Sequence, residues 1–148
     1  MPELEEYCER LLELLEEQPA EFSAAVRGAP SSSEVHQLMA HVRDLEVLAL
    51  APRLRRVLTE DSPHLEAFPS HHWSAEHYRA DEPLADILNE FARTRAELVN
   101  TLRSLSPEDW ARVGFHPPSG RRAALWWAER TLNHAREHLE EIRKSTIS

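Results

Sequence analysis

The chain contains 148 residues, of which 41% are hydrophobic and 29% are charged; only three are glycine, and the formal net charge is -9. This length suits a single domain over residues 1–148 that needs no disulfide or metal to fold, and the composition is typical of a helical protein. The excess of acidic residues argues against a nucleic-acid partner, because a protein that binds the phosphate backbone needs a basic surface.

The single cysteine and the N-terminal segment indicate where the protein works. Cys8 has no intramolecular partner, which fits a reducing compartment, and we expect it to be a small buried hydrophobe. The first 17 residues are rich in glutamate and lack the basic start and apolar core of a secretory signal. No apolar run approaches the roughly 20 residues of a membrane span. We therefore expect a cytoplasmic protein with no membrane partner.

The first predicted helix covers residues 3–17, where apolar residues recur at steps of three and four between glutamates. Pro19 is expected to end or interrupt this helix, because proline removes a backbone donor and crowds the preceding turn. One or two further turns can follow before Gly28 and Pro30 close the connection.

The second predicted helix begins after Ser31, which has the spacing of a capping box with Glu34. Pro52 falls inside the helical pattern and should kink the helix, which then continues to about Thr59. The buried side of this helix is formed by apolar residues at helical spacing: Val35, Leu38, Val42, Leu45, Leu48 and Ala49.

Residues 60–81 show little periodicity and are expected to be a long connection without a main helix of their own. A third helix follows, with Asp81 as its cap and Pro83 in its first turn. The segment SPEDW predicts one capped turn around Trp110, and GFHPPSG leads into the last helix, which begins near Ser119. The third helix has its own apolar side: Leu84, Ile87, Leu88, Phe91, Leu98 and Leu102.

The lengths of the connections predict how the helices are arranged. The first two helices are joined by a short link, which favours antiparallel neighbours. The 22 residues of 60–81 can reach roughly 70 Å at about 3.3 Å per residue, further than the roughly 42 Å length of a 28-residue helix. The expected fold is therefore all-α: a four-helix bundle in up-down-down-up order, with a long helix 2 to helix 3 crossover.

Two histidines in the last helix have the spacing of a metal chelate. His134 and His138 are four residues apart, so both lie on one helix face and their imidazoles can approach one cation at about 2.0 to 2.1 Å. His41 lies about 15 Å into the second helix, at the matching height of an antiparallel pair. All three lie at the edges of apolar stripes, which suits a pocket beside the core.

The histidine pair alone does not identify a metal site. Nine histidines in 148 residues give about half an H-x-x-x-H pair by chance, and a solvated helix edge has the same pattern. The matched height of His41 is the observation that favours a metal.

Over essentially its whole length the chain resembles the DinB-like, YfiT-type family of four-helix-bundle proteins. The resemblance rests on the order and spacing of four segments, which are LMAHVRDLE, LADILNEFARTRAELVNTLRSLSPEDW, GFHPPSGRRAAL and NHAREHLEEI. It implies a single DinB-like bundle domain over residues 1–148, frequently dimeric, with a metal held by one histidine of helix 2 and two of helix 4. Carried over residue by residue, these ligands are His41, His134 and His138, and we expect a homodimer.

Three neutral imidazoles leave a coordination position open, as in catalytic zinc sites. Such a metal can lower the pKa of a bound water to about 7 or hold a thiol as thiolate; Zn and Ni both suit imidazole ligands. Members of the resembled family include transferases that use low-molecular-weight thiols such as bacillithiol or mycothiol, and others are described as hydrolases. The resemblance therefore implies a metal-dependent S-transferase with a small-molecule substrate. The alternatives are a metal-dependent hydrolase, a non-catalytic metal-binding or stress-response bundle, and a structural helical dimer with surface histidines.

Other residues have competing interpretations. Asp44, one turn beyond His41, can orient an imidazole or be a solvated helix acid. His71, His72 and His77 would form a rival metal cluster, but in a loop without defined geometry exposed histidines are expected.

Further side chains are expected to serve the surface or the core. Arginines 53, 55, 56, 121 and 122 can receive an anionic substrate, although charge on a helix exterior is usually a solvated face. Trp126 and Trp127 are expected to pack in the core and not to stack on a ligand. The sequence contains no nucleophilic serine or cysteine motif and no phosphate-binding glycine loop.

Overall fold

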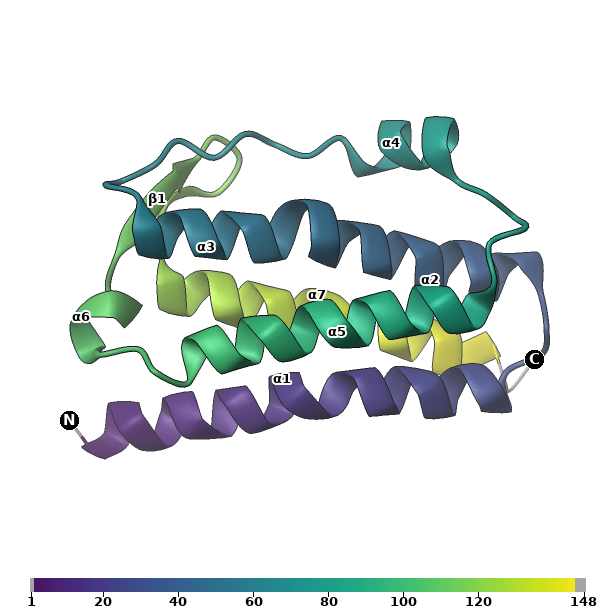
Figure 1. The fold of residues 1–148 in the computed structure, drawn as a ribbon, viewed down its shortest axis with the longest axis horizontal. Helices are drawn as coiled ribbons and strands as arrows, with labels where there is room; N and C mark the ends of the chain where they lie inside the picture. The colour runs from purple at the N-terminus through teal and green to yellow at the C-terminus, as the bar shows by residue number, and fades with distance from the viewer. Residues whose placement is uncertain (1, 146–148) are drawn as a thin grey trace.

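The computed structural model describes residues 2–145 and shows a bundle built from four long helical segments (Figure 1). The second segment is continuous through three elements, α2, η1 and α3, of which η1 is a π-helical turn. The predicted four-helix bundle is confirmed. The segments are α1 (Pro2–Gly28), α2 (Ser33–Leu45) with η1 (Glu46–Leu50) and α3 (Ala51–Thr59), α5 (Leu84–Leu102) and α7 (Ala124–Ser145).

A long crossover between α3 and α5 sets the direction of the helices (Figure 1). In Figure 1, α1 and α7 run from left to right, whereas the α2–α3 segment and α5 both run from right to left. The crossover, which connects α3 to α5, runs back along the outside of the bundle. No helix within residues 2–145 is long and apolar enough to cross a membrane.

Pro19 neither ends nor interrupts α1, so that expectation was wrong. A proline inside a helix leaves the carbonyl four residues earlier without its usual donor, which here is the carbonyl of Leu15. Arg95 of α5 donates from Nη1 to this oxygen at 2.8 Å. The helix therefore continues because a distant guanidinium replaces the hydrogen bond that proline removes.

Pro52 distorts its helix in a specific way. The expected kink takes the form of the π-helical turn η1, in which the N–H of Ala51 donates to the carbonyl of Glu46. Prolines and π-helical turns are both established causes of local helix distortion. The helical backbone continues through Pro52 into α3.

Two predicted helix caps were wrong. The cap of α2 is Ser32, not Ser31, and its hydroxyl accepts from the N–H of Val35 at 3.2 Å. Helix α5 has Pro83 at its N-cap position without a side-chain cap; Asp81 lies outside the helix and pairs with Arg79 at 3.6 Å.

The capped turn predicted at SPEDW is present as the short helix α6 (Pro107–Trp110). Ser106 and Asp109 form its capping box, each accepting a hydrogen bond from the other's backbone N–H at 3.1 Å.

The crossover and the last connection contain structure that the sequence did not predict. The crossover includes a short helix, α4 (Ser70–His77), and its start forms a parallel bridge between His64 and Phe115. The last connection is a hairpin of β1 (Val113–His116) and β2 (Gly120–Ala123), so α7 begins at Ala124 and not near Ser119. Gly120 has a φ of 83°, a value that glycine adopts without strain.

The described core contains three apolar clusters, and a layer of buried polar side chains lies between the two larger ones. Arg95 is fully buried and holds both carboxylate oxygens of Glu46, at 2.6 and 3.0 Å. The same guanidinium donates to Gln18 at 2.6 Å, and Gln18 donates to the carbonyl of Leu132 at 3.0 Å. The polar layer therefore links α1, η1, α5 and α7. Cys8 is buried in the cluster that includes Trp127, as predicted.

Arg95→Met should destabilise the fold strongly, because it leaves the carboxylate of Glu46 buried without a partner. Removing one member of a buried ion pair costs about 3 to 5 kcal/mol, which urea unfolding can measure. Arg93→Met, at an exposed position of the same helix, should change stability by less than about 0.5 kcal/mol. Equal losses of unfolding free energy in Arg95→Met and Arg93→Met would contradict the stabilising role of the buried polar layer.

Candidate metal centre

The structure brings together the three histidines that the sequence singled out. His41 projects from α2, and His134 and His138 project from α7. One ring nitrogen from each lies within 4.8 Å of the others. All three side chains are half-buried at the side of the core, as their positions at the edges of the apolar stripes predict.

The distance between the two α7 histidines fits a shared cation. Their Nε2 atoms are 3.2 Å apart. Two nitrogens bound to one tetrahedral zinc at about 2.0 to 2.1 Å lie about 3.3 Å from each other. The ring of His41 stands nearly perpendicular to that of His138, with centroids 4.9 Å apart, and is 6.3 Å from that of His134. The donor set and its spacing therefore fit a divalent metal.

Glu141 orients one of these rings. Its Oε1 lies 2.9 Å from Nδ1 of His138, so the carboxylate accepts the Nδ1–H and leaves Nε2 unprotonated toward the centre. Glu141 was not predicted from the sequence, although its position three residues after His138 on the same helix indicates that the two side chains are neighbours.

Asp44 does not orient a histidine. Its carboxylate accepts from Nε of Arg43 at 2.7 Å. Arg43 also holds both carboxylate oxygens of Glu82 at 2.8 Å and so fastens the end of the crossover to α2. Burial raises the pKa of the Asp44 carboxyl, while the neighbouring Arg43 lowers it. The hypothesis that Asp44 fixes an imidazole is therefore not supported by its contacts.

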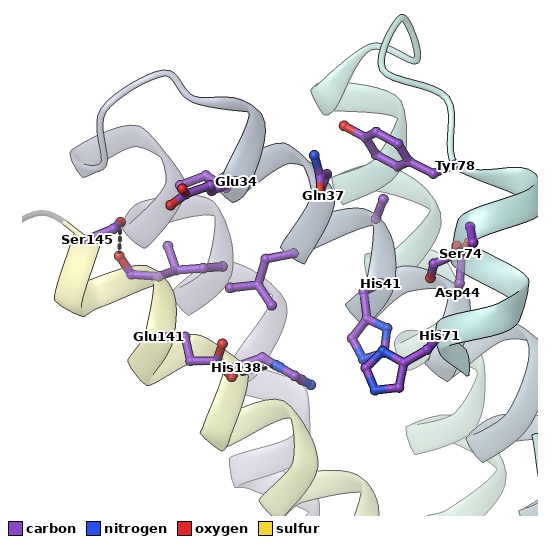
Figure 2. A pocket seen from close by; sticks show the side chains of 15 residues that line it. Glu34, Gln37, His41, Asp44, His71, Ser74, Tyr78, His138, Glu141 and Ser145 are labelled. Atoms are coloured by element: carbon purple, nitrogen blue, oxygen red, sulfur yellow. Dashed lines mark hydrogen bonds and ion pairs between the residues drawn. The ribbon is translucent and has the colours of Figure 1, made fainter. Parts of the chain in front are cut away.

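A cavity of about 800 Å³ lies beside the histidines, between α2, α4 and the end of α7 (Figure 2). In Figure 2, His138 points from α7 toward His41, and His71 of α4 lies beside the His41 ring. Leu38 and Ile142 contribute apolar lining. The same cavity is bordered by three carboxyl groups and no lysine or arginine: Glu34, Asp44 and Glu141.

The rival histidine cluster does not assemble. Within residues 2–145, no second group of three possible metal ligands is present. His72 pairs with Glu76 at 3.0 Å, and Nδ1 of His77 donates to the carbonyl of Trp73 at 3.0 Å. All three histidines are exposed, as predicted, and the ring of His71 is stacked on that of His41 with centroids 6.3 Å apart.

The arginines and tryptophans named in the sequence take part in other contacts. Trp127 is buried in the core, as expected, and the Arg53 guanidinium lies 5.7 Å from its ring centre. Arg122 lies over the ring of the partly buried Trp126 at 4.8 Å. These residues lie outside the lining of the cavity beside His41.

A family model described as the DinB superfamily matches residues 3–142. The chain belongs to the DinB superfamily. Among solved structures, it is similar to YfiT from Bacillus subtilis, described as a probable metal-dependent hydrolase with an unusual four-helix bundle topology. The two share 20% sequence identity with a TM-score of 0.86, over 95% of this chain and 86% of that chain. No match was found among the curated proteins.

Burial keeps two histidines of this DinB-superfamily protein neutral. It lowers the pKa of His134 to about 4, with further contributions from His138, Arg130 and His41. Burial also lowers the pKa of His41, as does the charge of His138. Neutral imidazoles are the form that binds metals, so the lowered pKa values of His134 and His41 favour that form of both side chains.

The pKa of His134 predicts how the stability of the metal-free protein changes with pH. Between its folded pKa of about 4 and its ordinary value of 6.5, the unfolded chain binds a proton that the folded protein does not. In chelator, the melting temperature should therefore fall as pH decreases through this window. His134→Gln should show a smaller fall, and His72→Gln should match the wild type. If the melting temperature of His134→Gln fell as steeply with decreasing pH as that of the wild type, burial would not be suppressing the protonation of His134.

Proposed function

We propose that this DinB-superfamily protein is a metal-dependent enzyme with His41, His134 and His138 as the ligands of a divalent cation. The observation that carries the proposal is the approach of three imidazole nitrogens to within 4.8 Å beside a cavity. The acceptor role of Glu141 toward His138 supports it, because ligating histidines commonly donate their second N–H to a carboxylate.

The residues of the chain have separable roles in this proposal. His134 and His138 hold the cation from one helix, so their spacing is fixed by helix geometry. His41 supplies the third ligand, from α2. Three imidazoles would leave a coordination position free, and a bound Zn²⁺ or Ni²⁺ would acidify a thiol or water ligand there. Leu38 and Ile142 exclude water from part of the cavity wall.

The proposed reaction is transfer of a low-molecular-weight thiol to a small-molecule substrate. An open position beside a cavity of about 800 Å³ has room for both a thiol and a second reactant. Because the cavity lining carries three carboxyls and no lysine or arginine, the second reactant should be neutral or cationic at its reacting end. A metal-dependent hydrolase is the second candidate, favoured by the description of YfiT.

The metal content tests the proposed site. Protein purified without a metal-affinity tag should contain about one equivalent of divalent metal, and His134→Ala should contain none. Elemental analysis of both proteins gives the answer and also identifies the metal. Absence of stoichiometric metal in the wild type, or full retention in His134→Ala, would refute the site.

The two candidate reactions can then be separated. Metal-loaded wild-type protein should form a thioether from bacillithiol or mycothiol and an uncharged alkyl halide, the sulfur displacing the halide and the thiol proton being released to solvent, and His41→Ala should not. Release of an acid from an ester or amide panel without thiol would instead establish the hydrolase. Catalysis of neither reaction class would refute the proposed thiol transfer and leave the site as a binding centre.

Glu141→Gln tests the orienting contact. Loss of such a carboxylate typically weakens metal affinity about 10- to 100-fold. Glu140→Gln is the matched control, since Glu140 is exposed on the same helix and pairs with Arg143 at 3.2 Å. Competition with a chromogenic chelator measures both affinities, and a similar affinity in the two variants would contradict the role of Glu141.

A further inference from the structure

The imidazole of His71, which belongs to the crossover, lies beside His41 of the proposed metal centre. Its ring centroid is 6.3 Å from that of His41, the same separation as between His41 and His134. The planes of His71 and His41 are within 11° of each other. His71 also lines the cavity that contains His41 and His138 (Figure 2).

The nitrogens of His71 are available for a ligand. Among the contacts of residues 2–145, the His71 ring meets the ring of His41 and makes no hydrogen bond or ion pair. Its two histidine neighbours on α4 differ, because His72 pairs with Glu76 and His77 with the carbonyl of Trp73. Of the three, His71 is therefore the histidine with free nitrogens near the cavity.

The helix that carries His71 is attached through its flanks. No residue of α4 is buried. Before the helix, Phe68 packs against the cluster of Leu45, Ala49 and Leu50. After it, the hydroxyl of Tyr78 donates to Nδ1 of His36 at 2.5 Å. A small shift of α4 or a new rotamer of the exposed His71 therefore disturbs no buried packing.

We propose that His71 is a fourth, displaceable imidazole ligand of the same metal. In the described conformation the group within 4.8 Å contains three histidines, so the fourth contact requires His71 to turn toward the centre. Four imidazoles make a closed site, and three make an open one. Helix α4 would thus close the open position in the resting protein and release it when a substrate thiol or water binds.

This inference rests on the proposed metal site, and Co²⁺ binding tests the two separately. The visible spectrum of bound Co²⁺ depends on the number and the kind of its ligands. His71→Ala should therefore have a different spectrum from the wild type, because water would take the place of an imidazole, and should bind Co²⁺ at least about tenfold more weakly, since even loss of an outer partner has that effect. His72→Ala, altered at the adjacent exposed position of α4, should match the wild type in both measurements.

The outcomes distinguish this inference from the metal site itself. If His71→Ala and His72→Ala have the same spectrum and affinity, His71 is not a ligand, and the three-histidine site stands. If the wild type does not take up one equivalent of Co²⁺, or His134→Ala still does, both proposals fall.

A thiol titration tests whether a thiol displaces His71 from the metal. Addition of 2-mercaptoethanol to the Co²⁺ protein should produce a thiolate-to-Co²⁺ absorption band. The band should appear at a lower thiol concentration in His71→Ala than in the wild type, because no imidazole has to be displaced. If the band appeared at the same thiol concentration in both proteins, His71 would not compete with the thiol for the open coordination position.

Discussion

The ion pair between Arg95 and Glu46 is the contact on which the bundle's arrangement depends. It lies between two apolar clusters and connects four helical segments through Gln18 and two backbone carbonyls. Apolar side chains can pack with similar energies in many alignments of the helices. The forked guanidinium of an arginine can form its hydrogen bonds in only a few of them. The polar layer therefore selects one alignment of the helices, and the apolar clusters on either side supply most of the burial energy.

The proposed metal centre depends on this alignment, although its three histidines are not part of the polar layer. His41 precedes Glu46 by less than two turns, and His134 follows Leu132 by two residues. The polar layer thus holds α2 and α7 in place close to the histidines that these helices carry. Helix α1 contributes no histidine to the centre, yet through Gln18 it holds the backbone of α7 in place. A site on rigid helices keeps its geometry better than one on loops.

Helix geometry explains how much of the fold and site could be predicted from the sequence. The spacing of His134 and His138 is a local property, and the height of His41 follows from a constant rise per residue. The continuity of α1 could not be predicted, because Pro19 is tolerated through Arg95, whose partner Leu15 is 80 residues away. Helix α4 buries no residue and so has no apolar stripe to detect, and each hairpin strand has four residues, too few for a clear alternation.

The π-helical turn η1 has a consequence for insertions and deletions. A turn closed by i to i+5 hydrogen bonds holds one residue more than an α-helical turn. Deleting one residue from Glu46–Leu50 would restore ordinary helical hydrogen bonding and leave α2 and α3 nearly in phase, whereas winding all five residues as a regular α-helix would rotate α2 relative to α3 by about 100°. His41 faces the histidines of α7 from one side of this turn, while Leu54 and Val57 pack in the core from the other. The π-helical turn thus accommodates the extra residue while keeping His41 and the core residues in phase, and a regular α-helix of the same length would lose one of these two contacts.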